Sequence, residues 1–178
     1  MAKMPEIFDS AFEMYTVKDI LGEGGSGRVF LVTDEKGVSF ALKCLFPDRV
    51  STEKRKRFKN EVDFCSKLNH PNVIGVLDSG LVVLDKVKCP FYVMPVYPMT
   101  LRKLIEKGIG HDRVLSAFSQ MLNGVEAAHF LGVTHRDLKP ENVLYDPKGE
   151  KLAVADFGIA HFEEEIIATS VSTKATTK

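Results

Sequence analysis

The sequence of 178 residues predicts an α+β fold, with an antiparallel sheet and one helix first and a mainly helical part second. Short runs of β-branched and aromatic residues separated by polar turns fill most of the first half, and one segment of helical period lies among them. A longer helical stripe follows in the second half. With 44% hydrophobic residues and a formal net charge of zero, the chain can bury the core of a globular domain.

The first two strands are expected on either side of a glycine-rich turn. The stretch Leu21–Val29 contains the pattern G-x-G-x-x-G-x-V, formed by Gly22, Gly24 and Gly27. It leads into the β-branched run 28–33, so we expect strand-turn-strand and not the strand-turn-helix of a dinucleotide-binding unit. Taken alone, the stretch indicates a plain hairpin. Glycines would also let the backbone fold over phosphates and point N–H groups at their oxygens.

The next strand and the first helix carry opposite charges. Residues 39–44 are expected to form a strand that contains Lys43, and residues 57–70 a helix that contains Glu61. One face of this helix gathers Phe58, Glu61, Val62, Cys65 and Leu68. A carboxylate on an apolar face is costly unless it is paired, so we expect Glu61 to pair with Lys43 from the facing sheet.

A hairpin and two helices complete the expected elements. Residues 76–84 and 91–96 predict two strands joined by a polar turn that ends in Cys89-Pro90, which gives a sheet of about five strands. A short helix is expected over 101–107 and a longer one over 111–131. Gly132 stands where a left-handed C-cap would end the longer helix.

The most specific motif lies after that glycine. Residues 135–142 read H-R-D-L-K-P-E-N, and Asp156-Phe157-Gly158 follows. An ordinary charged turn is the alternative, but eight residues that match one pattern in order are not expected by chance. The motif resembles the catalytic loop and D-F-G of the eukaryotic-type (Hanks-type) serine/threonine protein kinases. The glycine-rich turn and the strand ending near Lys43 match the same family in the expected order, from about Tyr15 to Gly158. Lys139 favours the Ser/Thr branch over the tyrosine kinases.

This resemblance implies a bilobal protein-kinase-like fold in a single domain, 1–178. It implies a complete N-lobe and hinge over 15–97, and the start of a helical C-lobe with the catalytic loop and D-F-G over 98–162. A partial activation segment, expected to be disordered, would follow over 163–178. Kinase domains usually continue through an A-P-E motif and further helices, so we expect a chain truncated within the activation segment and a C-lobe that is incomplete.

The resemblance also implies the roles of the polar residues. Asp137 would orient the substrate hydroxyl and accept its proton, and Lys139 would stabilise the transferring phosphoryl charge. Lys43, oriented by Glu61, would contact the α- and β-phosphates of ATP. The metal ligands would be Asn142 and Asp156, with Mg²⁺ as the expected ion because it needs only one or two protein oxygens.

For the adenine, the resemblance implies a hinge over 93–97 with Met94 as the gatekeeper. Pro95 would offer its carbonyl and Tyr97 its N–H. The residues expected to contact ATP are Leu21, Gly22, Gly24, Gly27, Val29, Ala41, Lys43, Pro95, Tyr97 and Leu144. A second apolar column that matches the family's regulatory spine would contain Val76, Cys65, Phe157 and His135. For each apolar residue taken singly, plain core packing is the simpler interpretation.

The expected function is transfer of the γ-phosphoryl group of ATP to a Ser or Thr hydroxyl of a protein substrate. The alternative is an ATP-binding regulatory half-kinase, or an inactive fragment, without phosphotransfer. Ser and Thr residues within 163–178 are candidates for regulatory phosphorylation, with Arg136 as their partner.

Composition excludes several other classes. The balanced charge argues against nucleic acid as a partner, and the basic run 54–59 is better explained as the solvated first half of a helix. The three cysteines are too few and too scattered for a metal site or a disulfide framework. Without a signal-like segment or a run of about twenty apolar residues, we expect no membrane contact and a cytoplasmic location. The oligomeric state is left open.

Overall fold

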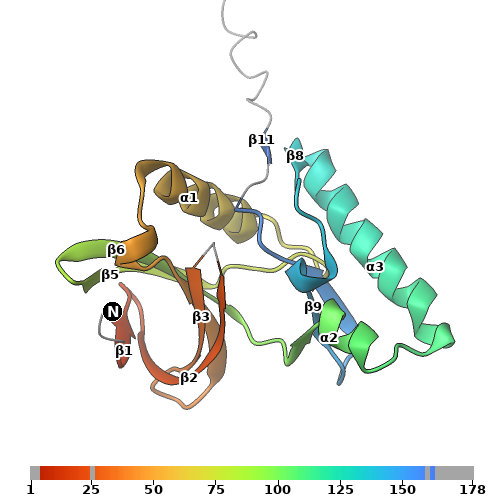
Figure 1. Ribbon diagram of the computed structural model, residues 1–178, viewed down its shortest axis with the longest axis horizontal. Coiled ribbons are helices and arrows are strands. Elements are labelled where there is room, and N and C mark those ends of the chain that lie inside the picture. Colours follow the sequence, from red (N-terminus) through yellow and green to blue (C-terminus); the bar gives the residue numbers. More distant parts are fainter. Residues whose placement is uncertain (1–4, 25–26, 159–160, 163–178) are drawn as a thin grey trace, which may run out of the picture.

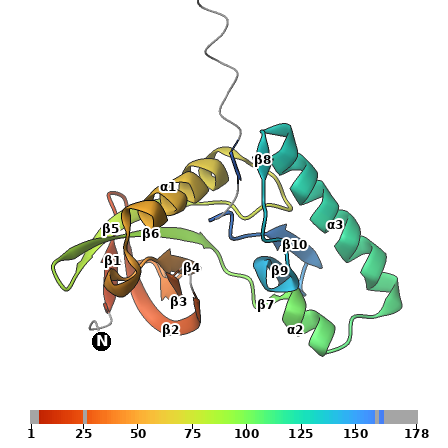
Figure 2. The same ribbon diagram turned by 45° about the horizontal axis from the view of Figure 1, so that its top comes forward.

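The computed structural model describes residues 5–24, 27–158 and the backbone of 161–162. These residues form two lobes, a sheet with one helix packed beside it and a mainly helical part (Figures 1 and 2). The α+β, bilobal fold class is therefore confirmed. The expected activation segment 163–178, with its Ser and Thr residues, lies outside the described residues.

The first lobe is built on a six-stranded antiparallel sheet with the order β1-β2-β3-β4-β6-β5. Its strands are β1 (Ile7–Asp9), β2 (Met14–Gly24), β3 (Gly27–Thr33), β4 (Ser39–Cys44), β5 (Asp78–Leu84) and β6 (Val87–Pro95). The sequence predicted about five, because β1 has only three residues and no alternating pattern long enough to detect. Tertiary contacts hold it instead: Phe8 is fully buried, and Asp78 in β5 accepts hydrogen bonds from Ser10 and Tyr15.

The hairpin between β5 and β6 turns earlier than predicted. Leu84 pairs with Val87, so the turn consists of Asp85 and Lys86, whose φ angles of 46° and 64° suit a tight two-residue hairpin. The predicted turn ending in Cys89-Pro90 is wrong. Pro90 lies inside β6, and its carbonyl accepts a hydrogen bond of 3.0 Å from the N–H of Leu45.

Helix α1 (Thr52–Lys67) packs beside this sheet. It begins before the predicted start at residue 57, because the Ser51 side chain accepts a hydrogen bond from the N–H of Lys54 and caps the N-terminus. It ends at Lys67, earlier than predicted. The face that turns inward is the expected one, with Phe58, Glu61 and Cys65 all buried, and the basic residues of the first half lie mostly exposed.

The second lobe contains α2 (Leu101–Glu106) and α3 (His111–Phe130), close to the predicted ranges. Gly132 follows α3 with a φ of 68°, which confirms the left-handed C-cap position. A small sheet with the order β10-β9-β7 packs with these helices. The remaining strands are β7 (Met99–Thr100), β8 (Val133–Thr134), β9 (Val143–Asp146), β10 (Lys151–Val154) and β11 (His161–Phe162), and two short 3₁₀ turns cover Pro47–Arg49 and Pro140–Asn142.

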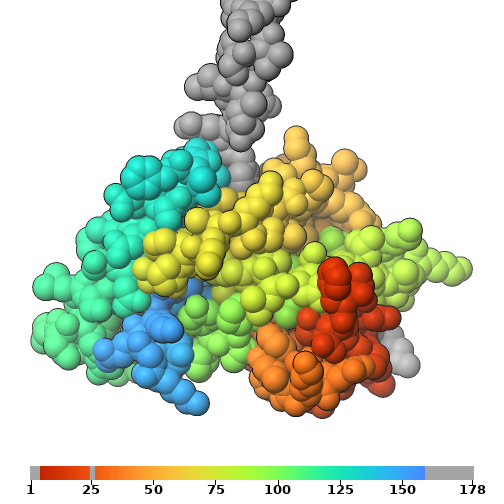
Figure 3. Space-filling model, turned by 180° about the vertical axis from the view of Figure 1, so that it is seen from behind, coloured from red at the N-terminus to blue at the C-terminus, as the bar shows by residue number. Residues whose placement is uncertain are grey.

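The segment between α1 and β5 joins the two lobes. Figure 3 shows it in yellow, crossing the back of the molecule between α3 and the first lobe. The N–H of Ile74 donates to the carbonyl of Val154, and the N–H of Val154 donates to the carbonyl of Asn72, at 2.9 and 2.8 Å. One hydrophobic core runs through both lobes, with Leu45 and Phe64 from the first and Val154 and Phe157 from the second. No helix within the described ranges is long and apolar enough to cross a membrane.

Candidate active site

A cavity of about 310 Å³ opens between the lobes, within the size range of small-molecule sites. Its walls come from the glycine-rich turn, from β4 and β6, from the connection to the second lobe, and from the loop before Phe157. The structure brings together on this cavity every residue that was expected to contact the nucleotide: Leu21, Gly22, Gly24, Gly27, Val29, Ala41, Lys43, Pro95, Tyr97 and Leu144. The two expected metal ligands, Asn142 and Asp156, line it as well.

The glycines of the turn serve different purposes. Gly27 has a φ of 133°, and a Cβ there would lie 2.5 Å from the carbonyl oxygen of Cys44, so only glycine fits. Among the residues that the structure describes, no neighbouring atom lies within 4 Å of a Cβ added at Gly22 or Gly24. Packing therefore does not require glycine at these two positions, and their bare backbone faces the cavity.

Two arginines hold the turn from outside the cavity. Glu23 forms ion pairs of 2.8 Å with Arg28 and with Arg49, and Arg49 also donates to the carbonyl of Gly24. The hydrogen bond from Arg28 lowers the pKa of Glu23. This role of Arg49 is not predictable from the sequence, because Arg49 lies in the short 3₁₀ turn after β4 and reaches the glycine-rich turn only in the folded chain.

The connection to the second lobe leaves a donor available at the cavity. Tyr97 follows β6 and lines the cavity, and within the described ranges its backbone N–H makes no hydrogen bond. Met94 lies opposite Ala41 in the β4–β6 ladder, and both also line the cavity. An acceptor that entered between these apolar side chains could therefore bind the N–H of Tyr97.

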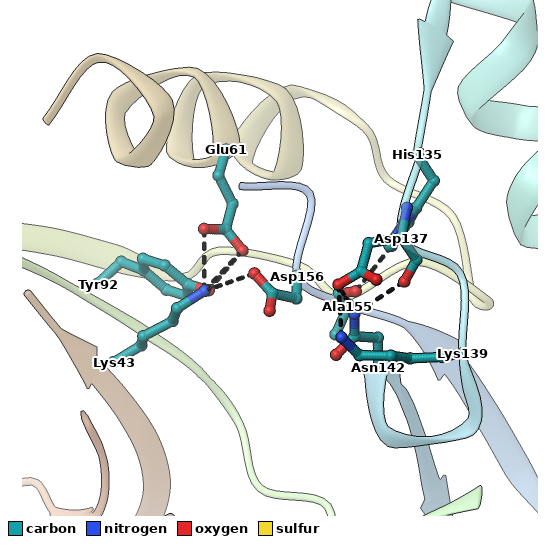
Figure 4. A network of polar contacts seen from close by, with 9 residues as sticks. All are labelled: Lys43, Glu61, Tyr92, His135, Asp137, Lys139, Asn142, Ala155 and Asp156. Carbon is teal, nitrogen blue, oxygen red and sulfur yellow. Dashed lines mark hydrogen bonds and ion pairs between the residues drawn. The ribbon is translucent and has the colours of Figure 1, made fainter. Parts of the chain in front are cut away.

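Lys43 and Glu61 form the expected buried ion pair (Figure 4). The Lys43 Nζ lies 3.1 Å from Oε1 and 3.0 Å from Oε2 of Glu61, and it also lies 3.1 Å from Oδ1 of Asp156. The Lys43 and Glu61 side chains are only 6% and 1% exposed, whereas Asp156 is 29% exposed. The lysine therefore joins helix α1 to the D-F-G segment.

The pKa values of this cluster follow from its burial. Burial raises the pKa of Glu61, although the charge of Lys43 opposes that shift. Burial alone would lower the pKa of Lys43, but the carboxylates of Glu61 and Asp156 together outweigh it, and the pKa is raised. The lysine therefore stays a cation at neutral pH, ready to meet an anionic group.

Tyr92 is a further member of the cluster that the sequence analysis missed. Its hydroxyl donates a hydrogen bond of 3.0 Å to Oε1 of Glu61, and the Nζ of Lys43 lies 5.6 Å from the centre of its ring. Tyr92 reaches Glu61 because it lies directly opposite Lys43 in the β4–β6 ladder. Sequence alone does not fix that register.

A second polar cluster surrounds Asp137 (Figure 4). Asp137 and Lys139 do not line the cavity themselves, but their partner Asn142 does. The Nζ of Lys139 lies 2.6 Å from Oδ2 of Asp137, and the side-chain amide of Asn142 donates to the same oxygen at 3.1 Å and to the carbonyl of Asp137 at 2.9 Å. The hydrogen bond from Lys139, helped by that from Asn142, lowers the pKa of Asp137. The carboxylate is therefore ionised at neutral pH and able to accept a hydrogen bond from a hydroxyl.

His135 fixes the start of this loop. Its Nδ1 accepts a hydrogen bond of 3.2 Å from the N–H of Asp137, and its Nε2 therefore donates to the carbonyl of Ala155 at 2.9 Å. Arg136 and Asp156 both have a φ of 64°, which is unusual for residues with a side chain. Such strained positions cluster at functional sites because the surrounding contacts hold them.

The fit of a divalent cation can be judged from Asn142 and Asp156. The two hydrogen bonds made by the Asn142 amide nitrogen turn its side-chain oxygen away from Asp137, and Asp156 contributes a partly exposed carboxylate to the same cavity. Within the described ranges, no group of three or more His, Cys, Asp or Glu side chains could hold a metal. A site with two protein oxygens suits Mg²⁺, which retains waters and binds phosphate oxygens.

Comparison with known proteins agrees with this arrangement. Residues 15–176 match the protein kinase domain. The chain belongs to the protein kinase family. Over 82% of its length it is 35% identical to a probable serine/threonine-protein kinase of Streptomyces coelicolor, of which it covers 22%. Over the same share of its length it is 38% identical to the serine/threonine-protein kinase pkn3 of Myxococcus xanthus, of which it covers 28%. Over 90% of its length it is 31% identical to calcium/calmodulin-dependent protein kinase type 1 of Caenorhabditis elegans, of which it covers 47%. The chain thus spans less than half the length of these relatives.

The four residues of the expected apolar column lie together, and Phe64 joins them as a further member. The ring of Phe157 is fully buried and lies 4.6 Å from the ring of His135 and 4.7 Å from the ring of Phe64. Cys65 belongs to the same core, and Val76 packs against it. Phe64 was missed because the predicted apolar face of the helix contained Cys65 and not its neighbour.

Proposed function

We propose that this chain supplies the nucleotide site and the catalytic loop of an ATP-dependent serine/threonine protein kinase. The observation that carries the proposal is that one cavity is lined both by the polar side chains of Lys43, Asn142 and Asp156 and by apolar side chains such as those of Val29, Ala41 and Leu144. A nucleoside triphosphate has the same division between an apolar base and an anionic tail.

The adenine would lie between Val29 and Ala41 on one side and Leu144 on the other, with Leu21 at the edge and the backbone of Pro95 and Tyr97 at the hinge. The phosphates would lie under Gly22, Gly24 and Gly27. Lys43, held by Glu61, would contact the α- and β-phosphates with its ammonium group. Because Lys43 stays charged and buried, this contact would be strong and fixed in place.

Asn142 and Asp156 would hold Mg²⁺, which would supply positive charge to offset that of the phosphates. Asp137 would orient the substrate Ser or Thr hydroxyl and accept its proton. Its lowered pKa makes it a weak base, so its main contribution would be to position the hydroxyl. Lys139, 2.6 Å from Asp137, would stabilise the charge on the transferring phosphoryl group.

The domain boundaries belong to this proposal. Residues 1–178 would form part of one kinase domain, with the first lobe and hinge over 15–97, the start of the second lobe over 98–162, and part of the activation segment over 163–178. The names of the serine/threonine kinases in the comparisons support a protein substrate, and the balanced charge supports neither nucleic acid nor a membrane as partner.

A second candidate is an ATP-binding half-kinase without phosphotransfer. The exposed apolar face of α3 supports this alternative, because Val114, Leu115, Phe118 and Leu122 are between 42% and 78% exposed. A lobe that leaves this much apolar surface uncovered would not hold the catalytic loop firmly. In this case the nucleotide would bind as proposed, but no phosphoryl group would be transferred from it.

Transfer of labelled γ-phosphate from ATP to a basic protein rich in Ser and Thr tests the first candidate. We expect Mg²⁺-dependent labelling that Asp137→Asn abolishes, since the amide is not a base and lacks the charge that pairs with Lys139. Glu150→Gln, an exposed acid outside the cavity, serves as the control. ATP binding without any Asp137-dependent labelling would favour the half-kinase, and absence of ATP binding in folded protein would refute both candidates.

A further inference from the structure

The Glu61 carboxylate has a second donor that comes from the sheet. Tyr92 is 2% exposed, and its hydroxyl donates to Oε1 of Glu61 at 3.0 Å, the oxygen that also lies 3.1 Å from the Nζ of Lys43. A carboxylate held by one ammonium group can still rotate about its last bond. A donor from another direction removes that freedom, so Tyr92 determines how Glu61 presents its oxygens to Lys43.

The position of Tyr92 is fixed by the backbone of the sheet. Tyr92 in β6 pairs directly with Lys43 in β4, and residues opposite each other in neighbouring strands project from the same face. The distance of 5.6 Å from the Lys43 Nζ to the ring centre is within the range of a cation–π contact. A tyrosine has only two side-chain torsions, so little freedom remains in the hydroxyl once the ring is packed.

Tyr92 also contacts the helix that carries Glu61 at a second point. The ring of Phe58 lies 5.2 Å from the ring of Tyr92, at an angle of 48°. Phe58 and Glu61 are three residues apart on α1 and therefore lie on one face, about one turn apart. One side chain of the sheet thus meets α1 through an aromatic contact and a hydrogen bond, and both of these contacts bear on where Glu61 lies.

We propose that Tyr92 is a positioning residue, whose hydroxyl holds the Glu61 carboxylate where it orients Lys43 toward the phosphate end of the cavity. The consequence for phosphate rests on the proposed function, because the orientation of Lys43 matters only if Lys43 binds phosphate. The contact between Tyr92 and Glu61 does not depend on it. The two parts are therefore tested by separate measurements.

The first test uses Tyr92→Phe, which keeps the ring and its contacts with Phe58 and Lys43 and removes only the hydroxyl. Tyr145→Phe is the matched control, because the Tyr145 hydroxyl is buried and has no hydrogen-bond partner in the part of the chain that the structure describes. The Glu61 carboxyl carbon is followed by NMR against pH, with Glu61→Gln to assign its signal. The groups that face Glu61 are Lys43, Tyr92, Asp156 and Cys65.

We expect the titration midpoint of Glu61 to rise in Tyr92→Phe and to stay in place in Tyr145→Phe, since a hydrogen bond to the ionised carboxylate favours that form. In the wild type, the signal of the Tyr92 ring carbon that bears the hydroxyl should follow the same titration as Glu61. This measurement needs no variant, so it decides the contact even if Tyr92→Phe does not fold. Two results would overturn the proposal. One is an unchanged Glu61 midpoint in folded Tyr92→Phe, and the other is a wild-type Tyr92 ring signal that does not change as Glu61 titrates.

The second test compares MgATP with adenosine, which lacks phosphates. Tyr92→Phe should weaken MgATP binding about two- to fivefold, the range expected for one lost positioning hydrogen bond, and leave adenosine binding unchanged. In a Glu61→Ala background, Tyr92→Phe should have no further effect, because the group that it positions is absent. Equal weakening for both ligands, or an effect that persists without Glu61, would show that Tyr92 acts only through packing. If the wild type binds no MgATP, the proposed function fails while the carboxyl titration still decides whether Tyr92 holds Glu61.

Discussion

The ammonium group of Lys43 lies 3.1 Å from the carboxylate of Asp156, so a strand of the first lobe and the D-F-G segment of the second lobe meet in one ion pair. Asp156 is also the expected ligand of Mg²⁺, and Lys43 is the expected ligand of the phosphates. When MgATP binds, Lys43 would turn part of its charge toward the phosphates and Asp156 would turn part of its charge toward the metal ion. The site therefore already has opposite charges at the positions where a metal and an anion would bind.

Binding of MgATP should stabilise the folded chain. At a ligand concentration of about one hundred times Kd, linkage gives about 2.7 kcal/mol, or a rise in melting temperature of roughly 5–10 °C for a chain of this size. Lys43→Met and Asp156→Ala should each reduce the rise, because each removes a group at the anionic end of the cavity. Differential scanning fluorimetry measures it, with Lys36→Met at an exposed turn as the control. An unchanged melting curve in folded wild type at saturating MgATP would exclude the site.

Loss of Glu61 should affect phosphotransfer more than nucleotide binding. Glu61→Ala leaves Lys43 with Asp156 alone and leaves the hydroxyl of Tyr92 without its acceptor, so the lysine stays near the phosphates but loses its orientation. We also expect a loss of stability of about 3 kcal/mol, because a buried pair is broken by removing one partner. Kinetics with varied ATP would show a lower kcat and a smaller change in KM. The control is Glu53→Ala on the same helix, where an exposed acid pairs with Arg57. Equal kcat for Glu61→Ala and wild type would place Glu61 outside the site.

Much of this site could be predicted from sequence because its motifs are local. The residues from His135 to Asn142 are close in the chain, and the pairing of Lys43 with Glu61 followed from a charge on the apolar face of a helix. Tyr92, Arg49 and β1 could not be predicted in this way. Their roles arise from strand register and from contacts between distant segments, and neither leaves a periodic pattern in the sequence. The early turn at Asp85 and Lys86 is a related case, because proline at position 90 indicates a turn although it lies within strand β6.

Gly124 lets helix α3 lie close against the segment between α1 and β5. A Cβ at this position would lie 2.3 Å from the carbonyl oxygen of Asn72, whose side chain also donates to the carbonyl of Leu152 at 2.8 Å. In a free helix, alanine would be favoured over glycine by about 1 kcal/mol, but here the added methyl must push the backbone of the segment between α1 and β5. We expect Gly124→Ala to lower the free energy of unfolding by about 1–3 kcal/mol.

Urea denaturation would measure this change in Gly124→Ala. Gly75→Ala lies in the same connecting segment, and no atom of the described part of the chain lies within 4 Å of a Cβ added there. This change should alter stability by less than about 0.5 kcal/mol. A Gly124→Ala protein as stable as the wild type would mean that α3 and the connecting segment can separate at little cost.

The exposed apolar face of α3 should make the chain self-associate. Leu115 is 78% exposed and Phe118 is 53% exposed, and an apolar hollow of about 160 Å³ lies between Phe118 and the side chains of α2. Continuous apolar surface of this kind favours association. Leu115→Glu combined with Phe118→Glu should shift the protein toward monomer in sedimentation velocity at micromolar concentration, without altering MgATP binding at the distant cavity. Leu81→Glu on β5 is the control, since Leu81 is 57% exposed and lies in the first lobe away from α3. If the wild type is monomeric, or if Leu81→Glu disperses it as well as the α3 variant does, then association does not depend on the α3 face. That face would then give no support to a loosely held catalytic loop.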